Sequence, residues 1–197
     1  PVITSPKCGA AELIQHGTTR LKKLDLKTKD QVEEIVKNLT DATYTVAGIK
    51  TSERKKTPPP PFTTSTLQQA GVNTLGFSSK KTMMLAQQLY EGVELGHHGP
   101  VGLITYMRTD SVNLSSEATQ RAHGVITQHF GPAYALSAPR GFTKKAKGAQ
   151  EAHEAIRPTD TGMLPDEVAS HVTTDQLKVY RLIWQRFMAS QMAAAKV

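Results

Sequence analysis

The sequence Gly102-Leu103-Ile104-Thr105-Tyr106-Met107-Arg108-Thr109-Asp110-Ser111 carries an apolar run into a tyrosine, an arginine, an acid and a hydroxyl. In an extended segment side chains alternate between faces, so Tyr106 and Arg108 are predicted to point the same way. A phenol beside a guanidinium suits attack on a phosphodiester, because arginine can bind two phosphate oxygens and offset their charge. The structural alternative is a core tyrosine with its hydroxyl at the rim.

Two other stretches complete a pattern with this one. The string Tyr106 to Ser111 (YMRTDS) resembles the active-site tyrosine motif of type IA DNA topoisomerases. The stretches 61–69 (PFTTSTLQQ) and 150–158 (QEAHEAIRP) resemble two further motifs of that family, and the three follow in the family's order. The chain is most similar to the bacterial topoisomerase I branch, over nearly its whole length.

The resemblance implies a mechanism and assigns roles. Tyr106 would attack single-stranded DNA and form a 5′-phosphotyrosyl link with a free 3′-hydroxyl. Strand passage and religation would then relax negative supercoils without ATP. By resemblance, Arg108 stabilises the scissile phosphate, His153 serves the phosphate network as a proton relay, and Asp110 has a supporting role. A histidine also suits proton transfer because it titrates near neutral pH.

Further residues are expected to contact DNA. If the stretch around His153 and Arg157 is helical, both side chains lie on one face. Hydroxyls ahead of a helix can bind phosphate, although plain N-capping by Ser65 or Thr66 explains them equally well. The predicted DNA contacts are Arg157, Ser111, Ser65, Thr66, Lys80 and Lys81.

The resemblance also implies what this chain lacks. The family binds Mg²⁺ through an Asp-x-Asp pair in a Toprim domain, and the sequence contains no Asp-x-Asp. We therefore expect a fragment with an incomplete active site, inactive alone, with the Toprim domain as partner and no cofactor of its own. The adjacent His97 and His98 lack acids or cysteines at ligand spacing, so no metal site is predicted.

Composition is consistent with an anionic partner. Lys and Arg number 24 against 17 Asp and Glu, which gives a formal net charge of +7 and a pI near 9.5. Such a balance favours nucleic acid without proving it. The lone Cys8 excludes an internal disulfide, and no apolar run reaches membrane-spanning length. We expect a cytoplasmic, monomeric chain with no membrane partner.

The predicted fold class is α+β and mainly α. Residues 1–62 are predicted to form part of an arched β domain, with a helix capped by Thr28 and a strand at 44–50. Residues 63–192 are predicted to be a helical domain with helix-turn-helix (CAP-like) character that carries the tyrosine, and 193–197 to return towards the β domain. The prolines 58–61 are either a stiff connector, which the resemblance favours, or a segment pinned to the surface.

Inside the helical domain, Gly71 is predicted to end the first helix, and Ser78 or Ser79 to begin the second, which ends at Gly92. Asn113 or Ser115 is predicted to begin the helix that ends at Gly131. The stretch 166–192 is predicted to be helical, with a break near residue 174. Its apolar stripe is Leu177, Tyr180, Ile183, Trp184, Phe187 and Met188.

Two other functions remain open at this point. A tyrosine recombinase or type IB-like enzyme also uses Tyr, Arg and His, but it places the tyrosine after its arginines and leaves a 3′-phosphotyrosine. A basic helix-turn-helix module without chemistry would bind DNA through charge alone. It predicts that Tyr106→Phe leaves every activity intact.

Overall fold

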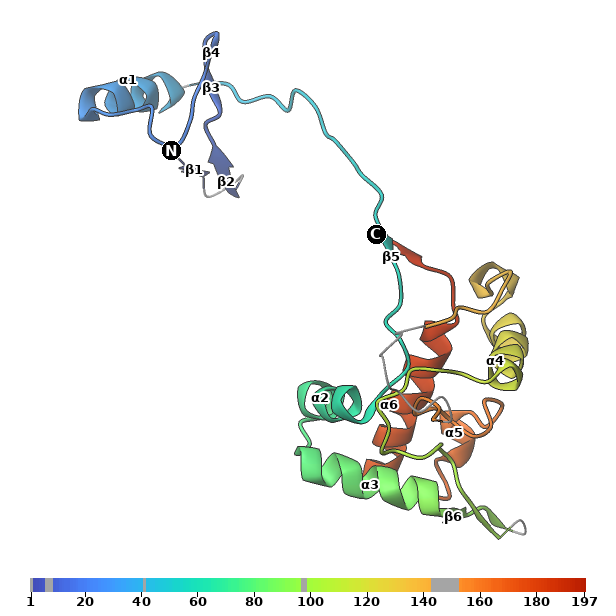
Figure 1. The fold of residues 1–197 in the computed structure, drawn as a ribbon. Helices are drawn as coiled ribbons and strands as arrows, with labels where there is room; N and C mark the ends of the chain where they lie inside the picture. The colour runs from blue at the N-terminus through green and yellow to red at the C-terminus, as the bar shows by residue number, and fades with distance from the viewer. Residues whose placement is uncertain (1, 6–8, 41, 97–98, 143–152) are drawn as a thin grey trace. The chain divides into compact units, whose positions relative to one another are not determined.

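The computed structural model describes residues 2–5, 9–40, 42–96, 99–142 and 153–197. They form two compact units, Pro1–Ser52 and Glu53–Val197, each considered by itself. The predicted α+β class with a majority of helix is confirmed (Figure 1). Cys8, His97, His98 and residues 143–152 lie outside the described residues.

The first unit contains two small hairpins and one helix. Strand β1 (Val2–Ser5) pairs with β2 (Gly9–Glu12), and β3 (Gln15–His16) pairs with β4 (Thr19–Arg20), both antiparallel. Helix α1 (Lys29–Thr40) begins as predicted, because the Gln31 N–H donates to Thr28 Oγ1 and Gln31 Oε1 accepts from the Thr28 N–H. Of the apolar stripe expected on this helix, Ile35 is buried.

The strand predicted at 44–50 is wrong. Residues 42–54 have no regular secondary structure, and Tyr44, Val46 and Ile49 are exposed. Alternation forms a half-buried strand only where a neighbouring strand pairs with it and another surface covers its apolar face. Within the described residues neither is present for this segment.

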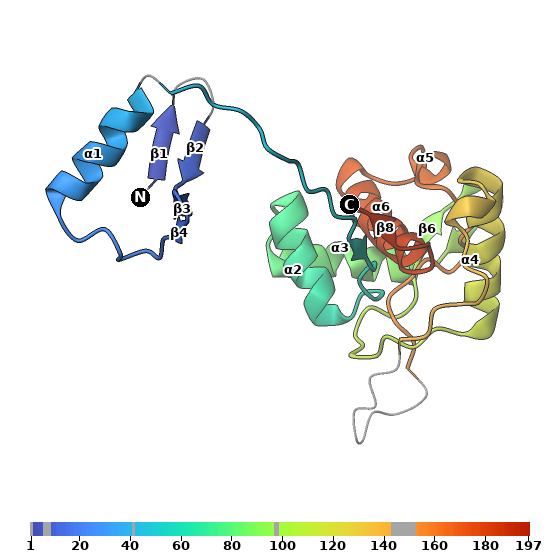
Figure 2. The same ribbon diagram turned by 90° about the horizontal axis from the view of Figure 1, so that it is seen from above.

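The second unit is a helical body built on one long helix. Its helices are α2 (Thr64–Leu75), α3 (Ser79–Glu91), α4 (Ser116–His129), α5 (Pro165–Val168), α6 (Thr174–Ser190) and the short 3-10 helix η2 (Pro132–Tyr134). Helix α6 contacts α2, α3 and α5 (Figures 1 and 2). Most of the predicted apolar stripe on α6 is confirmed, because Tyr180, Ile183, Trp184, Phe187 and Met188 are buried.

The first two helices of this body form the expected helix-turn-helix pair. Helices α2 and α3 contact each other and are joined by residues 76–78. Ser78 caps α3 and Gly92 follows its end, as predicted. Gly71 does not end α2, which continues until Gly76 adopts a φ of +67°. Gly71 is instead a point of close packing, because a Cβ there would collide with the Thr82 side chain of α3.

The proline segment belongs to the helical body. The Arg186 guanidinium of α6 donates from Nε to the Pro60 carbonyl at 2.7 Å and lies 4.8 Å from the Phe62 ring centroid. These contacts support the pinned alternative rather than a free connector. The predicted boundary at residues 62 and 63 therefore falls inside the second unit.

Two short strand pairs complete the second unit. Strand β6 (Val93–Glu94) and β7 (Pro100–Val101) form the hairpin between α3 and the tyrosine segment. Strand β8 (Ala195–Lys196) pairs with β5 (Lys55–Lys56), so the end of the chain returns to the segment that enters this unit (Figure 1).

Candidate active site

The three sequence motifs meet at one place in the helical body. Backbone hydrogen bonds join the first motif (61–69) to the tyrosine segment and to the third motif (150–158). They also join the tyrosine segment to the third motif. Isolated β-bridges pair Phe62 with Ile156 and Ile104 with Pro158. The three connecting bonds are Ile156 N–H to Phe62 O (2.8 Å), Thr105 N–H to Arg157 O (2.9 Å) and Thr64 N–H to Thr109 O (2.9 Å).

Two threonine hydroxyls fix the tyrosine segment on either side. Thr64 Oγ1 donates to the Met107 carbonyl and accepts from the Thr109 N–H, both at 2.8 Å. Thr105 Oγ1 donates to the Ala155 carbonyl at 2.7 Å and accepts from the Arg157 N–H at 3.0 Å. A hydroxyl that both donates and accepts holds a segment in one register. Sequence reasoning did not assign either hydroxyl this role.

The predicted alternation of the tyrosine segment is confirmed. Tyr106, Arg108 and Asp110 are exposed, whereas Met107 is 4% and Thr109 is 7% exposed. Tyr106 itself is 48% exposed, so the alternative of a core tyrosine is wrong. The buried side chains anchor the segment in the core, which leaves the phenol and the guanidinium on its open side.

A second tyrosine packs against the first. The rings of Tyr90 and Tyr106 meet edge to face, with centroids 5.3 Å apart and planes at 63°. Tyr90 lies near the end of α3, and the Leu103 N–H donates to the Leu89 carbonyl at 2.8 Å. Gly102 allows this approach, because a Cβ there would lie 2.7 Å from the Tyr90 carbonyl oxygen. Tyr90 was not predicted, because it lies outside the three sequence motifs and its exposed ring is seen only in the structure.

Four of the predicted site residues line one hollow of about 500 Å³, which we call the histidine hollow. Arg108, Asp110 and His153 face it together with Ser65, Thr64, Gln68 and Thr109. The structure thus brings together the arginine, acid and imidazole that the sequence placed up to 45 residues apart. A cation, a hydroxyl and an imidazole around one cavity are suited to binding a phosphate.

An adjoining hollow of about 350 Å³, the methionine hollow, shares Arg108 and Gln68 with the first. Lys80 lines it, and its contact with DNA stays a prediction. Lys81 does not, because its Nζ lies 2.6 Å from the Asp175 carboxylate and 4.1 Å from the Phe77 ring centroid. This ion pair and cation–π contact direct Lys81 towards α6 and away from the site.

The third motif is extended rather than helical at residues 153–158. His153 is exposed, whereas the Arg157 guanidinium donates to both Glu154 carboxylate oxygens and to the Pro158 carbonyl. Arg157 therefore holds the third motif together, and its contact with DNA stays a prediction. Burial raises the pKa of Glu154, but hydrogen bonds from Arg157 and the Ser115 N–H outweigh it and leave that pKa lowered.

Of the remaining predicted DNA contacts, Thr66 takes part in a helix cap, Ser65 lines the histidine hollow and Ser111 forms a local turn. Thr63 caps α2, with Thr66 as its partner in the capping box, so the prediction that Ser65 or Thr66 is the N-cap is wrong. Ser65 is exposed and lines the histidine hollow. Ser111 Oγ accepts from the Asn113 N–H at 3.1 Å, which forms a local turn.

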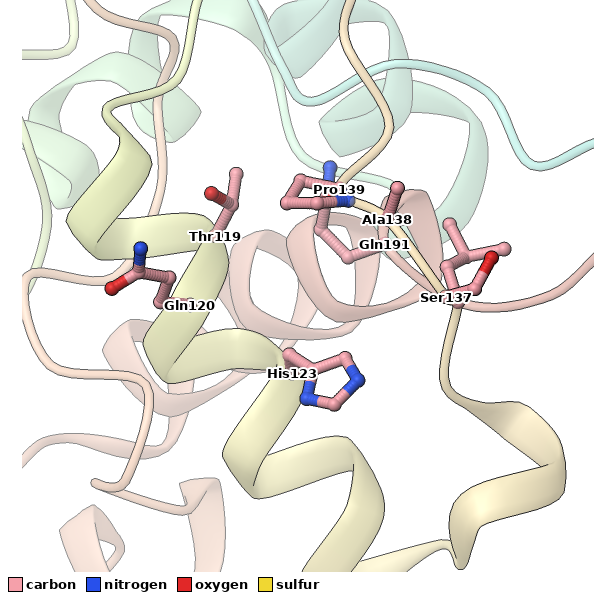
Figure 3. Close-up of a pocket in the computed structure, with 8 residues that line it drawn as sticks. Thr119, Gln120, His123, Ser137, Ala138, Pro139 and Gln191 are labelled. Atoms are coloured by element: carbon pink, nitrogen blue, oxygen red, sulfur yellow. The ribbon is translucent and has the colours of Figure 1, made fainter.

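The described ranges contain neither a cluster of metal ligands nor a membrane-spanning helix. No three His, Cys, Asp or Glu side chains gather there as metal ligands. No helix in those ranges has the length and apolar character to cross a membrane. A separate hollow of about 310 Å³ between α4 and residues 136–139 contains none of the predicted site residues; Thr119, Gln120 and His123 face it (Figure 3).

Comparisons with known proteins agree with this geometry. A family profile described as DNA topoisomerase matches residues 8–197. DNA topoisomerase 1 of Campylobacter jejuni is 49% identical over 185 residues, which cover 94% of this chain and 26% of that protein. Full-length topoisomerase I from Thermotoga maritima matches in structure, with a TM-score of 0.64, 48% identity, and coverage of 75% of this chain and 22% of that one.

The chain therefore spans about a quarter of the length of these relatives. The match with the family runs through all three motifs and the segments that join them. This chain belongs to the bacterial DNA topoisomerase I family.

Proposed function

We propose that this chain carries the nucleophile of a type IA DNA topoisomerase. Tyr106 Oη attacks a backbone phosphorus of single-stranded DNA and loses its proton. The bond from phosphorus to the 3′ oxygen breaks, and that oxygen takes a proton to become a free hydroxyl. The observation that carries the proposal is the exposed Tyr106, two residues before an exposed Arg108 that lines one hollow with Asp110 and His153.

The residues near the phenol are assigned phosphate binding and proton transfer. The Arg108 guanidinium is exposed and permanently charged, so it binds the scissile phosphate and offsets its developing negative charge. A tyrosine has an ordinary pKa near ~10, so a neighbouring group must take its proton. Arginine has no acceptor for it. The His153 imidazole can both accept and donate a proton, and it is the relay we assign, with Asp110 in support.

The proposal requires a further domain. By resemblance to the family, we assign Mg²⁺ to a Toprim domain that is not part of this chain. The metal would supply charge stabilisation at the phosphate when that domain closes over Tyr106. Strand passage then relaxes negative supercoils without ATP, in the cytoplasm, and this chain alone does not relax DNA. Mg²⁺-dependent relaxation by the isolated chain would contradict this assignment.

The decisive experiment is covalent DNA capture by the full-length enzyme under denaturing conditions. Tyr106→Phe removes the attacking oxygen and is expected to abolish capture. Tyr134→Phe is the matched control, because Tyr134 is also exposed and lies in η2, outside the three sequence motifs. End-labelled oligonucleotides give the polarity: protein attached to the 5′ end supports type IA, and attachment to the 3′ end would assign type IB chemistry.

A further inference from the structure

The methionine hollow next to Arg108 has no role in the chemistry described above. Building on the proposed function, we propose that it receives one unstacked base of the DNA strand. The base belongs to the nucleotide whose 5′-phosphate becomes linked to Tyr106. At about 350 Å³ the hollow falls in the size range of small-ligand sites, roughly 300–1,000 Å³.

Helix α3 presents two different faces, and the second one forms this hollow. Thr82, Leu85, Ala86 and Leu89 are buried and pack into the core. Lys80, Met83, Met84 and Gln87 recur at helical spacing on another face and line the hollow, and half-buried Met83 also packs against the core. Met84 is 51% exposed, so its thioether is available at the surface and is not used to fill the core.

The chemistry of the lining suits a nucleobase. Methionine sulfur is polarizable and makes favourable contacts with aromatic rings. Glutamine amides both donate and accept, so they can pair with the edge of any base. Within the described part of the chain the Gln68 amide makes no hydrogen bond, and Gln87 uses its NH₂ group on Glu91 at 2.7 Å. The Gln87 carbonyl oxygen thus remains an acceptor.

The position of the hollow selects the nucleotide. Arg108 and Gln68 border both the methionine hollow and the histidine hollow. The scissile phosphate is joined through a single sugar to the base on either side of it, so a phosphate at Arg108 puts both bases within reach of the neighbouring hollow, and we assign the base of the nucleotide that stays linked to Tyr106. The mixed amide and thioether lining assigns no preferred base, which agrees with sequence-tolerant binding of single strands.

The test combines a change in the DNA with a change in the hollow. In the full-length enzyme, covalent capture is measured with an oligonucleotide cut at one position, with and without a tetrahydrofuran abasic residue immediately 3′ of the cut. Loss of the base is expected to lower capture by wild type about tenfold. The double variant Met84→Ala/Gln87→Ala is expected to lower capture of the intact strand similarly, and to be nearly insensitive to the abasic residue.

Three results would overturn the proposal. The first is wild-type capture that does not respond to the abasic residue. The second is an equal abasic penalty in wild type and double variant, which would place the base elsewhere. The third is covalent capture of the intact strand by the double variant at the wild-type level.

The controls keep this test separate from the proposed function. Gln120→Ala alters a glutamine of the distant hollow and is expected to behave as wild type. Both altered side chains of α3 are exposed, so urea midpoints should stay unchanged. Tyr106→Phe reports on the nucleophile with either oligonucleotide: its retained capture would refute the proposed function, whatever the hollow binds.

Discussion

Thr64 connects the start of α2 to the tyrosine segment, so removing its hydroxyl tests directly whether these hydrogen bonds hold the segment in place. Thr64→Val keeps the shape and removes both hydrogen bonds, to the Met107 carbonyl and from the Thr109 N–H. Thr109 is 7% exposed, so its N–H would be left nearly buried without a side-chain acceptor. An unsatisfied buried donor costs roughly 1–3 kcal/mol, and we expect a loss of about 2 kcal/mol.

Urea unfolding of the chain measures this loss. A change of about 2 kcal/mol lowers the folding equilibrium constant about 30-fold and shifts the midpoint at constant slope. Thr64→Ser is the matched control, because it keeps the hydroxyl and is expected to lose well under half of that amount. In the full-length enzyme, Thr64→Val should also weaken covalent capture, since the two bonds lie on either side of Arg108.

The reasoning would be refuted if Thr64→Val and Thr64→Ser had the same urea midpoint. That result would mean that the hydroxyl contributes no net stability and that packing alone holds the tyrosine segment. Equal midpoints with unequal DNA capture would place the role of the hydroxyl in the DNA complex.

Two neighbouring lysines provide a second prediction, measured by fluorescence anisotropy of single-stranded DNA binding at several salt concentrations. Lys80→Ala is expected to lower the slope of log binding constant against log salt concentration by about 0.7. Lys81→Ala should leave that slope unchanged, because the Lys81 ammonium is paired with Asp175 of α6. The lowered pKa of Glu154 gives a third, because a depressed carboxyl pKa adds stability above its ordinary 4.5 that is lost as pH falls through the folded value. Glu154→Gln should therefore flatten the stability profile below pH 4.5 in urea titrations, and an unchanged slope there would contradict the ion pair. Tyr90→Leu removes the edge contact on Tyr106, worth about 1 kcal/mol, and should slow DNA cleavage about fivefold in single-turnover assays without changing DNA affinity. A loss of affinity would instead make Tyr90 a DNA contact.

The sequence predicted those features whose causes lie within a few residues of one another. The capping box at Thr28 and Gln31, the start of α3 at Ser78 and its end at Gly92 all depend on local hydrogen bonds and backbone conformation. Exposed and buried side chains alternate from Tyr106 to Asp110 as the sequence predicted, although the backbone bends at Thr105 and Met107. The family followed from three motifs that are each contiguous in the chain.

Local reasoning was wrong where a distant partner decided the outcome. Gly71 looked like a helix end, but α2 continues because a glycine there lets Thr82 of α3 pack closely. The alternating segment 44–50 looked like a strand, but strand formation needs a partner that local sequence does not supply. The ion pair of Arg157 with Glu154 was likewise not predicted from the local sequence.

The tertiary structure alone decided how the site is assembled. Hydrogen bonds across 43 to 52 residues join Thr64 to Met107 and Thr105 to Arg157, and nothing in either local sequence indicates the pairing. Such contacts form only when the core fixes the distance between segments, since closing long loops costs entropy that burial must offset. The sequence by itself therefore indicated the proposed nucleophile and its neighbouring guanidinium, whereas packing determined which imidazole, hydroxyl and amide lie close to that guanidinium.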